Sequence, residues 1–182
     1  TPGQSLNLTA VIANTSIEAA EVYPANYWYS LMQVPDKSEF PGTGGDGNGI
    51  ATGVRTQAHW IDLLKQGCQL CHQLGNLATR EIPNPQDFDS TEAAWAHRIV
   101  TGQRASNMAG TLGRFGRERA VAAYADWTDR ITAGEVPEQP PRPVGRERDI
   151  VLTMWEWGGE TAYIHDEVAS DKRDPTVNAG GP

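Results

Sequence analysis

The stretch Cys68-Gln69-Leu70-Cys71-His72 decides how the fold of this 182-residue sequence is interpreted. It contains the only two cysteines of the chain, separated by two residues, and a histidine directly after the second. On its N-terminal side, Trp60, Leu63 and Leu64 form an apolar i, i+3, i+4 stripe, which is the spacing of one helix face. The sequence therefore predicts a helix that begins near Thr56 and runs into the cysteines.

This motif has the residue types and the spacing that covalent haem attachment requires. Two thiols at this distance can reach the two vinyl groups on one edge of a porphyrin, and a directly following imidazole can turn under the iron. Cys68 and Cys71 are therefore predicted to bind one haem c. His72 is predicted to be the proximal iron ligand.

Two other interpretations of the cysteine pair are less well supported. A thioredoxin-type dithiol also uses Cys-x-x-Cys, but it expects a βαβ context, whereas helices are predicted on both sides of Cys71. A structural zinc site would need two more ligands at matching spacing, and the chain has no second cysteine pair. Haem attachment is the interpretation that the residues favour.

Two more helices are predicted downstream of the motif. The second opens at Asp89-Ser90-Thr91-Glu92, which has the pattern of a capping box, and runs to about Thr101. The third spans about Arg117 to Thr132, and Gly134 stands where a helix stop belongs. Its apolar face consists of Ala120, Tyr124, Trp127 and Ile131.

The sixth iron ligand is chosen by position along the chain. Met108 ends the loop of residues 102–108 between the second and third helices, where its thioether could reach the open face of the iron. A core methionine is the alternative, although a polar, Gly-flanked loop is a poor place for core packing. His97 is two positions from both Trp95 and Ile99 and so turns away from the apolar edge of its helix; it remains an alternative, as does an open sixth position. Less well placed are His59, upstream on the helix of the motif, and Met154 and His165, beyond a Pro-rich connector.

The flanks predict irregular and β-like structure. Leu6, Leu8 and Ala10 alternate with polar residues, which is the pattern of a strand, and residues 150–155 are a second candidate. The remaining flanking segments are a turn-rich stretch over 35–53, a Pro-rich connector over 135–148 and a polar, Gly-rich end over 169–182. The expected organisation is an N-terminal extension over 1–55, a haem domain over 56–134, and a connector with a C-terminal extension over 135–182.

Charge and composition limit the partners and the location. The formal net charge of −8 speaks against nucleic acid or an anionic membrane surface as a partner. No apolar run approaches the ~20 residues that a spanning helix needs. Covalent haem attachment of this kind takes place outside the cytoplasm, so a periplasmic, extracellular or cell-surface location is expected. The chain starts with Thr1, without Met, which suggests a processed form or a segment of a longer polypeptide.

The order helix, Cys-x-x-Cys-His, loop, helix, Met loop, long final helix resembles class I cytochrome c, over roughly residues 56–134. The resemblance implies a mainly α, cytochrome c-like haem domain in which the first and last helices cross. Leu63 or Leu64 would then meet Tyr124 or Trp127. It also implies that Pro83 offers its carbonyl to His72 Nδ1, with Pro85 as the alternative.

The flanks resemble something narrower, the cytochrome segment of large secreted bacterial proteins. Those proteins join a carboxypeptidase-regulatory-like β-sandwich, a cytochrome c module and a β-propeller. The segments that carry this resemblance are Tyr27-Trp28-Tyr29-Ser30-Leu31, Ser38-Glu39-Phe40-Pro41-Gly42-Thr43-Gly44, Ala125-Asp126-Trp127-Thr128-Asp129-Arg130 and Tyr163-Ile164-His165-Asp166-Glu167. It implies that the opening strand is the tail of a β-domain and that the last residues lead towards a propeller.

The expected function is one-electron transfer through a single haem with His72 and Met108 as axial ligands. Such a haem has no free site for a substrate, so the chain is expected to carry electrons to and from redox partner proteins rather than to catalyse a reaction by itself. One alternative is an open-site haem enzyme or a gas- or peroxide-binding haem protein. Another is an electron-relay module of a larger, multidomain secreted oxidoreductase.

Overall fold

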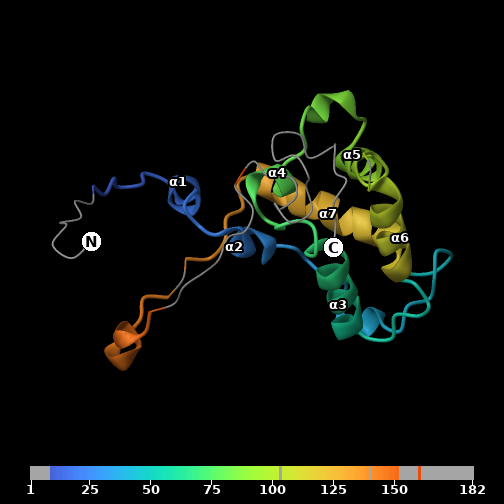
Figure 1. Ribbon diagram of the computed structural model, residues 1–182, viewed down its shortest axis with the longest axis horizontal. Coiled ribbons are helices and arrows are strands. Elements are labelled where there is room, and N and C mark those ends of the chain that lie inside the picture. The colour runs from blue at the N-terminus through green and yellow to red at the C-terminus, as the bar shows by residue number, and fades with distance from the viewer. Residues whose placement is uncertain (1–8, 103, 140, 152–159, 161–182) are drawn as a thin grey trace.

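The computed structural model describes residues 9–102, 104–139, 141–151 and 160. Helices dominate this part of the chain, and no strand occurs in it, so the mainly α class is confirmed there (Figure 1). The α-helices are α1 (Ser16–Ala20), α2 (Ala25–Tyr29), α3 (Gln57–Cys68), α4 (Leu77–Arg80), α5 (Thr91–Arg98), α6 (Ala105–Phe115) and α7 (Arg117–Thr132). Short 3-10 turns occupy Lys37–Glu39, Pro85–Asp87 and Gly145–Asp149.

The helices predicted from the sequence begin where their capping residues stand. The Thr56 side chain accepts a hydrogen bond from the His59 amide (3.2 Å) at the start of α3. The Ser90 side chain accepts a hydrogen bond from the Ala93 amide (3.1 Å) at the start of α5. This helix ends at Arg98 and is therefore shorter than predicted, since the sequence indicates an end near Thr101. The long final helix has the predicted limits, and the glycine after it has a φ of +96°.

The strands predicted in the flanks are wrong where the structure describes them. Residues 9–13 and 150–151 belong to no helix or strand, and the rest of both predicted strands lies outside the described residues. Val11, Ile12 and Val151 are 87–89% exposed. A segment with an alternating pattern forms a strand only where a neighbouring strand completes its backbone hydrogen bonds. The described residues supply no such partner.

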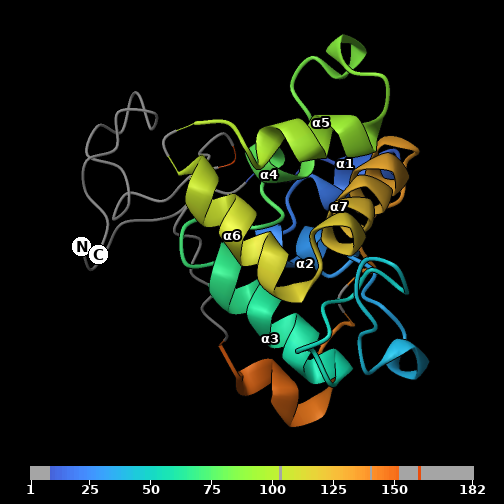
Figure 2. The same cartoon turned by 90° about the vertical axis from the view of Figure 1, so that its right-hand side faces the viewer.

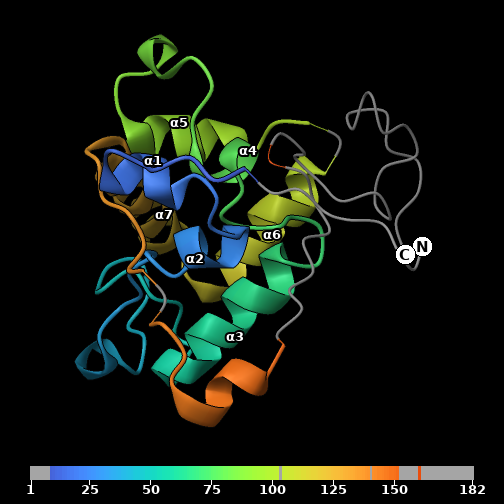
Figure 3. The same cartoon turned by 90° about the vertical axis from the view of Figure 1, so that its left-hand side faces the viewer.

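Four helices form the bundle: α6 packs against α3 on one side and approaches α7 on the other, and α7 packs against α5 (Figure 2). α1 and α2 lie on one face of the bundle, in front of α7 in Figure 3. None of the helices in the described part combines the length and the apolar character that crossing a bilayer demands.

α3 and α6 run antiparallel and cross closely. The Trp60 ring, near the start of α3, meets the Phe115 ring, at the end of α6, with 5.3 Å between centroids. Near the end of α3, a Cβ on Gly67 would lie 2.2 Å from Thr111 Cγ2, so the crossing requires glycine there. The main helix partner of α3 is therefore α6, and α3 meets the final helix where the Tyr124 hydroxyl reaches Cys68.

The sequence predicts a loop over 102–108, whereas the structure has helix α6 over Ala105–Phe115. Met108, Leu112 and Phe115 form an apolar stripe at i, i+4 and i+7. Gly110 and Gly113 lower the helix propensity of this segment, so the stripe alone does not indicate a helix. Packing against α3 and α7 overrides that weak local preference.

The segment before α3 closes one end of this bundle. Ile50 and Val54 are at most 1% exposed and share a core with Trp60 and Phe115. Gly116, between α6 and α7, has a φ of +105°, and a Cβ on it would lie 2.1 Å from the Gly49 carbonyl oxygen. Residues of the predicted N-terminal extension thus pack into the core of the helical domain.

Candidate functional site

The Cys-x-x-Cys-His motif lies at the C-terminal end of α3 and continues its winding. Cys68 is the last residue of α3. The amides of Cys71 and His72 both donate to the Cys68 carbonyl oxygen, at 3.2 and 3.0 Å. Both cysteines are free thiols, and these two residues and the histidine are half-buried. The predicted attachment residues therefore share one turn of backbone.

Cys68 meets a tyrosine of the final helix. The Tyr124 hydroxyl donates to Cys68 Sγ at 3.3 Å, and its ring stacks on Trp95 of α5 with centroids 4.6 Å apart. Burial raises the pKa of the Cys68 thiol, the hydrogen bond from Tyr124 lowers it, and Cys71 raises it further. Cys68 is therefore a largely neutral thiol against an aromatic wall built by α5 and α7.

Cys71 has different neighbours. Its pKa is raised by burial and lowered by the positive charge of Arg104, which directly precedes α6. The two thiols of the motif thus have unequal surroundings: Cys68 contacts Tyr124, whereas Cys71 is under the electrostatic influence of Arg104.

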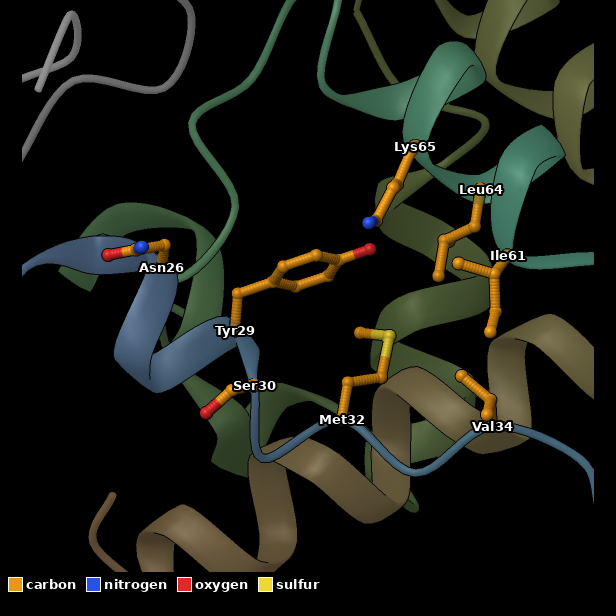
Figure 4. Close-up of a pocket in the computed structure, with 8 residues that line it drawn as sticks. All are labelled: Asn26, Tyr29, Ser30, Met32, Val34, Ile61, Leu64 and Lys65. Atoms are coloured by element: carbon orange, nitrogen blue, oxygen red, sulfur yellow. The ribbon is translucent and has the colours of Figure 1, made fainter. Parts of the chain in front are cut away.

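A second tyrosine approaches the motif from α2. Burial, and then the nearby Cys68, raise the pKa of Tyr29 well above its ordinary value. Its hydroxyl points toward α3 at Lys65 (Figure 4). Neither Tyr29 nor Tyr124 was predicted as a site residue. The only sequence signals were the aromatic cluster at residues 27–29 and the apolar stripe of the final helix.

A pocket of about 270 Å³ lies between α2 with its following segment and the part of α3 that precedes the motif. Its lining residues are Asn26, Tyr29, Ser30, Met32, Val34, Ile61, Leu64 and Lys65 (Figure 4). Leu64 lies one helical turn before Cys68, so the pocket follows the cysteine-bearing face of α3. The apolar side chains of Met32 and Leu64 are both buried.

Met108 lies in helix α6, which corrects its predicted place in a loop. It is half-buried and packs against the hydrophobic core. It precedes Thr111 by about one turn, and Thr111 meets Gly67 next to the motif. The antiparallel pairing of α3 with α6 therefore brings Met108 to the same end of the bundle as the cysteines.

The other candidate ligands lie elsewhere. His97 is exposed, as its position on α5 predicted, and its ring lies 5.3 Å from that of Phe88. His59 is exposed on α3. Met154 and His165 lie outside the described residues. Pro83 is exposed in the loop between α4 and the turn Pro85–Asp87, and its contact with His72 stays a prediction.

The donor set at this end of the bundle fits a covalent haem better than a zinc ion. Two free thiols and an imidazole lie within one turn, with a thioether on the neighbouring helix and aromatic rings beside Cys68. Among the described residues, no three His, Cys, Asp or Glu side chains gather as a metal site. The ligands that a structural zinc site adds to a cysteine pair are thus missing from this part of the chain.

No protein-family model, no curated protein and no solved structure matches this chain.

Proposed function

We propose that this protein is a c-type cytochrome that binds one haem covalently through Cys68 and Cys71 and transfers single electrons. The observation that carries the proposal is the turn at the end of α3. There the backbone amides of Cys71 and His72 both donate to the Cys68 carbonyl oxygen, so two free thiols and a histidine lie within one turn. Thioether attachment of haem uses two thiols and an adjacent histidine, which is the set found in this turn. His72 is the proximal ligand in this proposal.

A haem would supply the reversible one-electron change of its iron. The residues of the chain would hold it and keep water away. Tyr124 and Trp95, which are 4% and 6% exposed, offer an aromatic wall beside Cys68. A haem would also add a large apolar surface to a bundle end where the thiols and Met108 are only half-buried.

Met108 is the proposed sixth ligand. Its position at the motif end supports it, whereas His97 is exposed on α5. A thioether favours the ferrous state and raises the reduction potential relative to a second histidine. With both axial positions taken, electron transfer is favoured over chemistry on a bound substrate.

The proposed setting is outside the cytoplasm, because haem is attached to such motifs there. The partners would be other redox proteins, or further domains of a larger secreted assembly in which this module relays electrons. The net charge of −8 favours a partner with a basic docking face over nucleic acid.

The experiment is visible absorption of the protein produced in a bacterium that attaches c-type haem. The reduced protein should show a sharp α-band, and the oxidised protein the weak long-wavelength band of a methionine–iron bond. Met108→Ala should abolish that weak band. Met32→Ala removes the other methionine of the described residues and is the matched control, which should keep it.

Two outcomes would contradict parts of this proposal. A weak band that survives Met108→Ala would disprove Met108 as the ligand. Rapid binding of carbon monoxide by the native reduced protein would favour the open-site alternative over electron transfer.

A further inference from the structure

Tyr124 is the hydroxyl group that meets the Cys68 sulfur inside the bundle. The oxygen–sulfur distance is 3.3 Å, and the tyrosine is 4% exposed. A hydroxyl buried in this way needs an acceptor, because an unpaired one costs about 1–3 kcal/mol. The sulfur is the acceptor that the structure supplies.

The position of the Tyr124 ring is fixed by contacts that do not involve the cysteine. It stacks on Trp95, with centroids 4.6 Å apart and an angle of 26° between planes. Its edge meets Trp127 at 6.3 Å. Trp95 is itself held by a hydrogen bond from its Nε1 to Thr128 Oγ1 (3.0 Å). The hydroxyl is thus aimed at the sulfur by α5 and α7.

We propose that Tyr124 is a positioning residue for the haem, whose hydroxyl donates a hydrogen bond to the Cys68 thioether sulfur. This inference rests on the proposed function. In the attachment, the sulfur adds to one carbon of a haem vinyl group and the hydrogen of the S–H bond goes to the other carbon. No electron is gained or lost overall. The sulfur keeps its lone pairs and remains a weak acceptor.

The hydrogen bond acts on one edge of the haem only. A donor withdraws electron density from the sulfur and so from the ring that it joins, which favours the reduced iron. Hydrogen bonds near a redox centre are one of the means by which a protein sets its potential. Among the described residues, a tyrosine hydroxyl donates to Cys68 and none to Cys71, so the two thioether edges are unequal.

The test is the Tyr124→Phe variant of the haem-bound protein, which keeps the ring and its stacking on Trp95 but loses the hydroxyl. Its matched control is Tyr29→Phe, which removes the other phenol near Cys68 from a different helix. We expect Tyr124→Phe to have a lower midpoint potential than the wild type. Its oxidised form should show changed proton shifts for the haem substituents beside Cys68, with the absorption bands of the axial ligands unchanged. Tyr29→Phe should change both quantities less.

A Tyr124→Phe protein with the wild-type potential and wild-type haem shifts would overturn this inference. If that variant fails to fold, a nuclear magnetic resonance measurement on the wild-type protein tests the hydrogen bond instead. A slowly exchanging Tyr124 hydroxyl proton with cross-relaxation to the Cys68 β-protons supports the hydrogen bond, and its absence in a fully assigned spectrum overturns it. A wild-type protein without covalent haem would instead refute the proposed function, which keeps the two failures apart.

Discussion

The two ends of the α3–α6 helix pair are packed in different ways. At the closed end, defined by Trp60, Phe115, Ile50 and Val54, every side chain is at most 1% exposed. At the motif end, defined by Cys68, Cys71, His72 and Met108, the side chains are half-buried. Leu70, inside the motif, is 59% exposed.

This difference separates the end of the helix pair that stabilises the fold from the end where haem is proposed to bind. The closed end completes its own core with apolar side chains and a glycine-dependent close approach. The motif end combines the groups proposed to bind haem with side chains that are only half-buried. An apolar cofactor at that end would bury surface worth roughly 25 cal/mol per Å². Substitutions at the closed end should therefore act on folding, and those at the motif end on the binding of the proposed haem.

The largest expected effect is at the closed end. Phe115→Ala removes a fully buried ring that meets Trp60 edge to face at 5.3 Å, so we expect a loss of about 3–5 kcal/mol in the free energy of unfolding. Urea denaturation measures it. Leu70→Ala at the motif end is the matched control and should change stability by less than about 0.5 kcal/mol. Equal losses in the two variants would remove the contrast between the ends.

The helix crossing between the two ends comes next. Gly67→Ala places a methyl group 2.2 Å from Thr111 Cγ2 and should cost about 1–3 kcal/mol in stability. Thr111→Ser removes the clashing methyl group. Added to Gly67→Ala, it should restore most of the loss, which a double-mutant cycle measures. Additive effects of the two substitutions would show that the helices do not cross at this pair.

Alkaline pH should weaken the motif end. Burial raises the pKa values of Tyr124 and Tyr29 above their ordinary 10.0. Above that value the unfolded chain loses phenolic protons that the folded chain keeps. The free energy of unfolding should therefore fall as pH rises past 10, by up to about 1.4 kcal/mol per pH unit from Tyr124.

Urea denaturation at several pH values checks this slope. The Tyr29→Phe/Tyr124→Phe double variant is expected to lose most of it. A slope that persists undiminished in the double variant would assign the alkaline sensitivity to other groups.

The smallest expected effect is at the rim of the closed end. Arg119 binds both carboxylate oxygens of Glu39 at 2.8 Å, which ties the turn Lys37–Glu39 to α7. Both side chains are about one-third exposed, so solvent screens the pair. Glu39→Gln should cost about 0.2–1 kcal/mol, and the cost should shrink at high salt. A larger loss that salt does not reduce would point to a packing role for this turn.

The parts of the fold that depend on local signals could be predicted from the sequence. α3, α5 and α7 follow from capping residues such as Thr56 and Ser90 and from apolar stripes. The spacing of Cys68, Cys71 and His72 is equally local. α6 could not be predicted, because Gly110 and Gly113 mask its stripe and tertiary packing decides its conformation.

Contacts between segments far apart in the chain could not be predicted from the sequence. The contact of Tyr124 with Cys68 joins residues far apart in the chain, and nothing in either local sequence requires it. The same holds for the pairing of α3 with α6, which is larger than the contact of α3 with the final helix. The strands failed for a related reason, since a strand needs a partner that the alternation pattern does not name.

The most direct test of haem attachment is the intact mass and pyridine haemochrome spectrum of the protein produced in a haem-attaching bacterium. A Cys68→Ala/Cys71→Ala double variant serves as the control. The predicted result is a chain heavier by one haem, with a c-type haemochrome that acid and organic solvent do not extract, and a control without covalent haem. A wild-type chain at the mass of the polypeptide alone, or one whose haem is extracted, would contradict it.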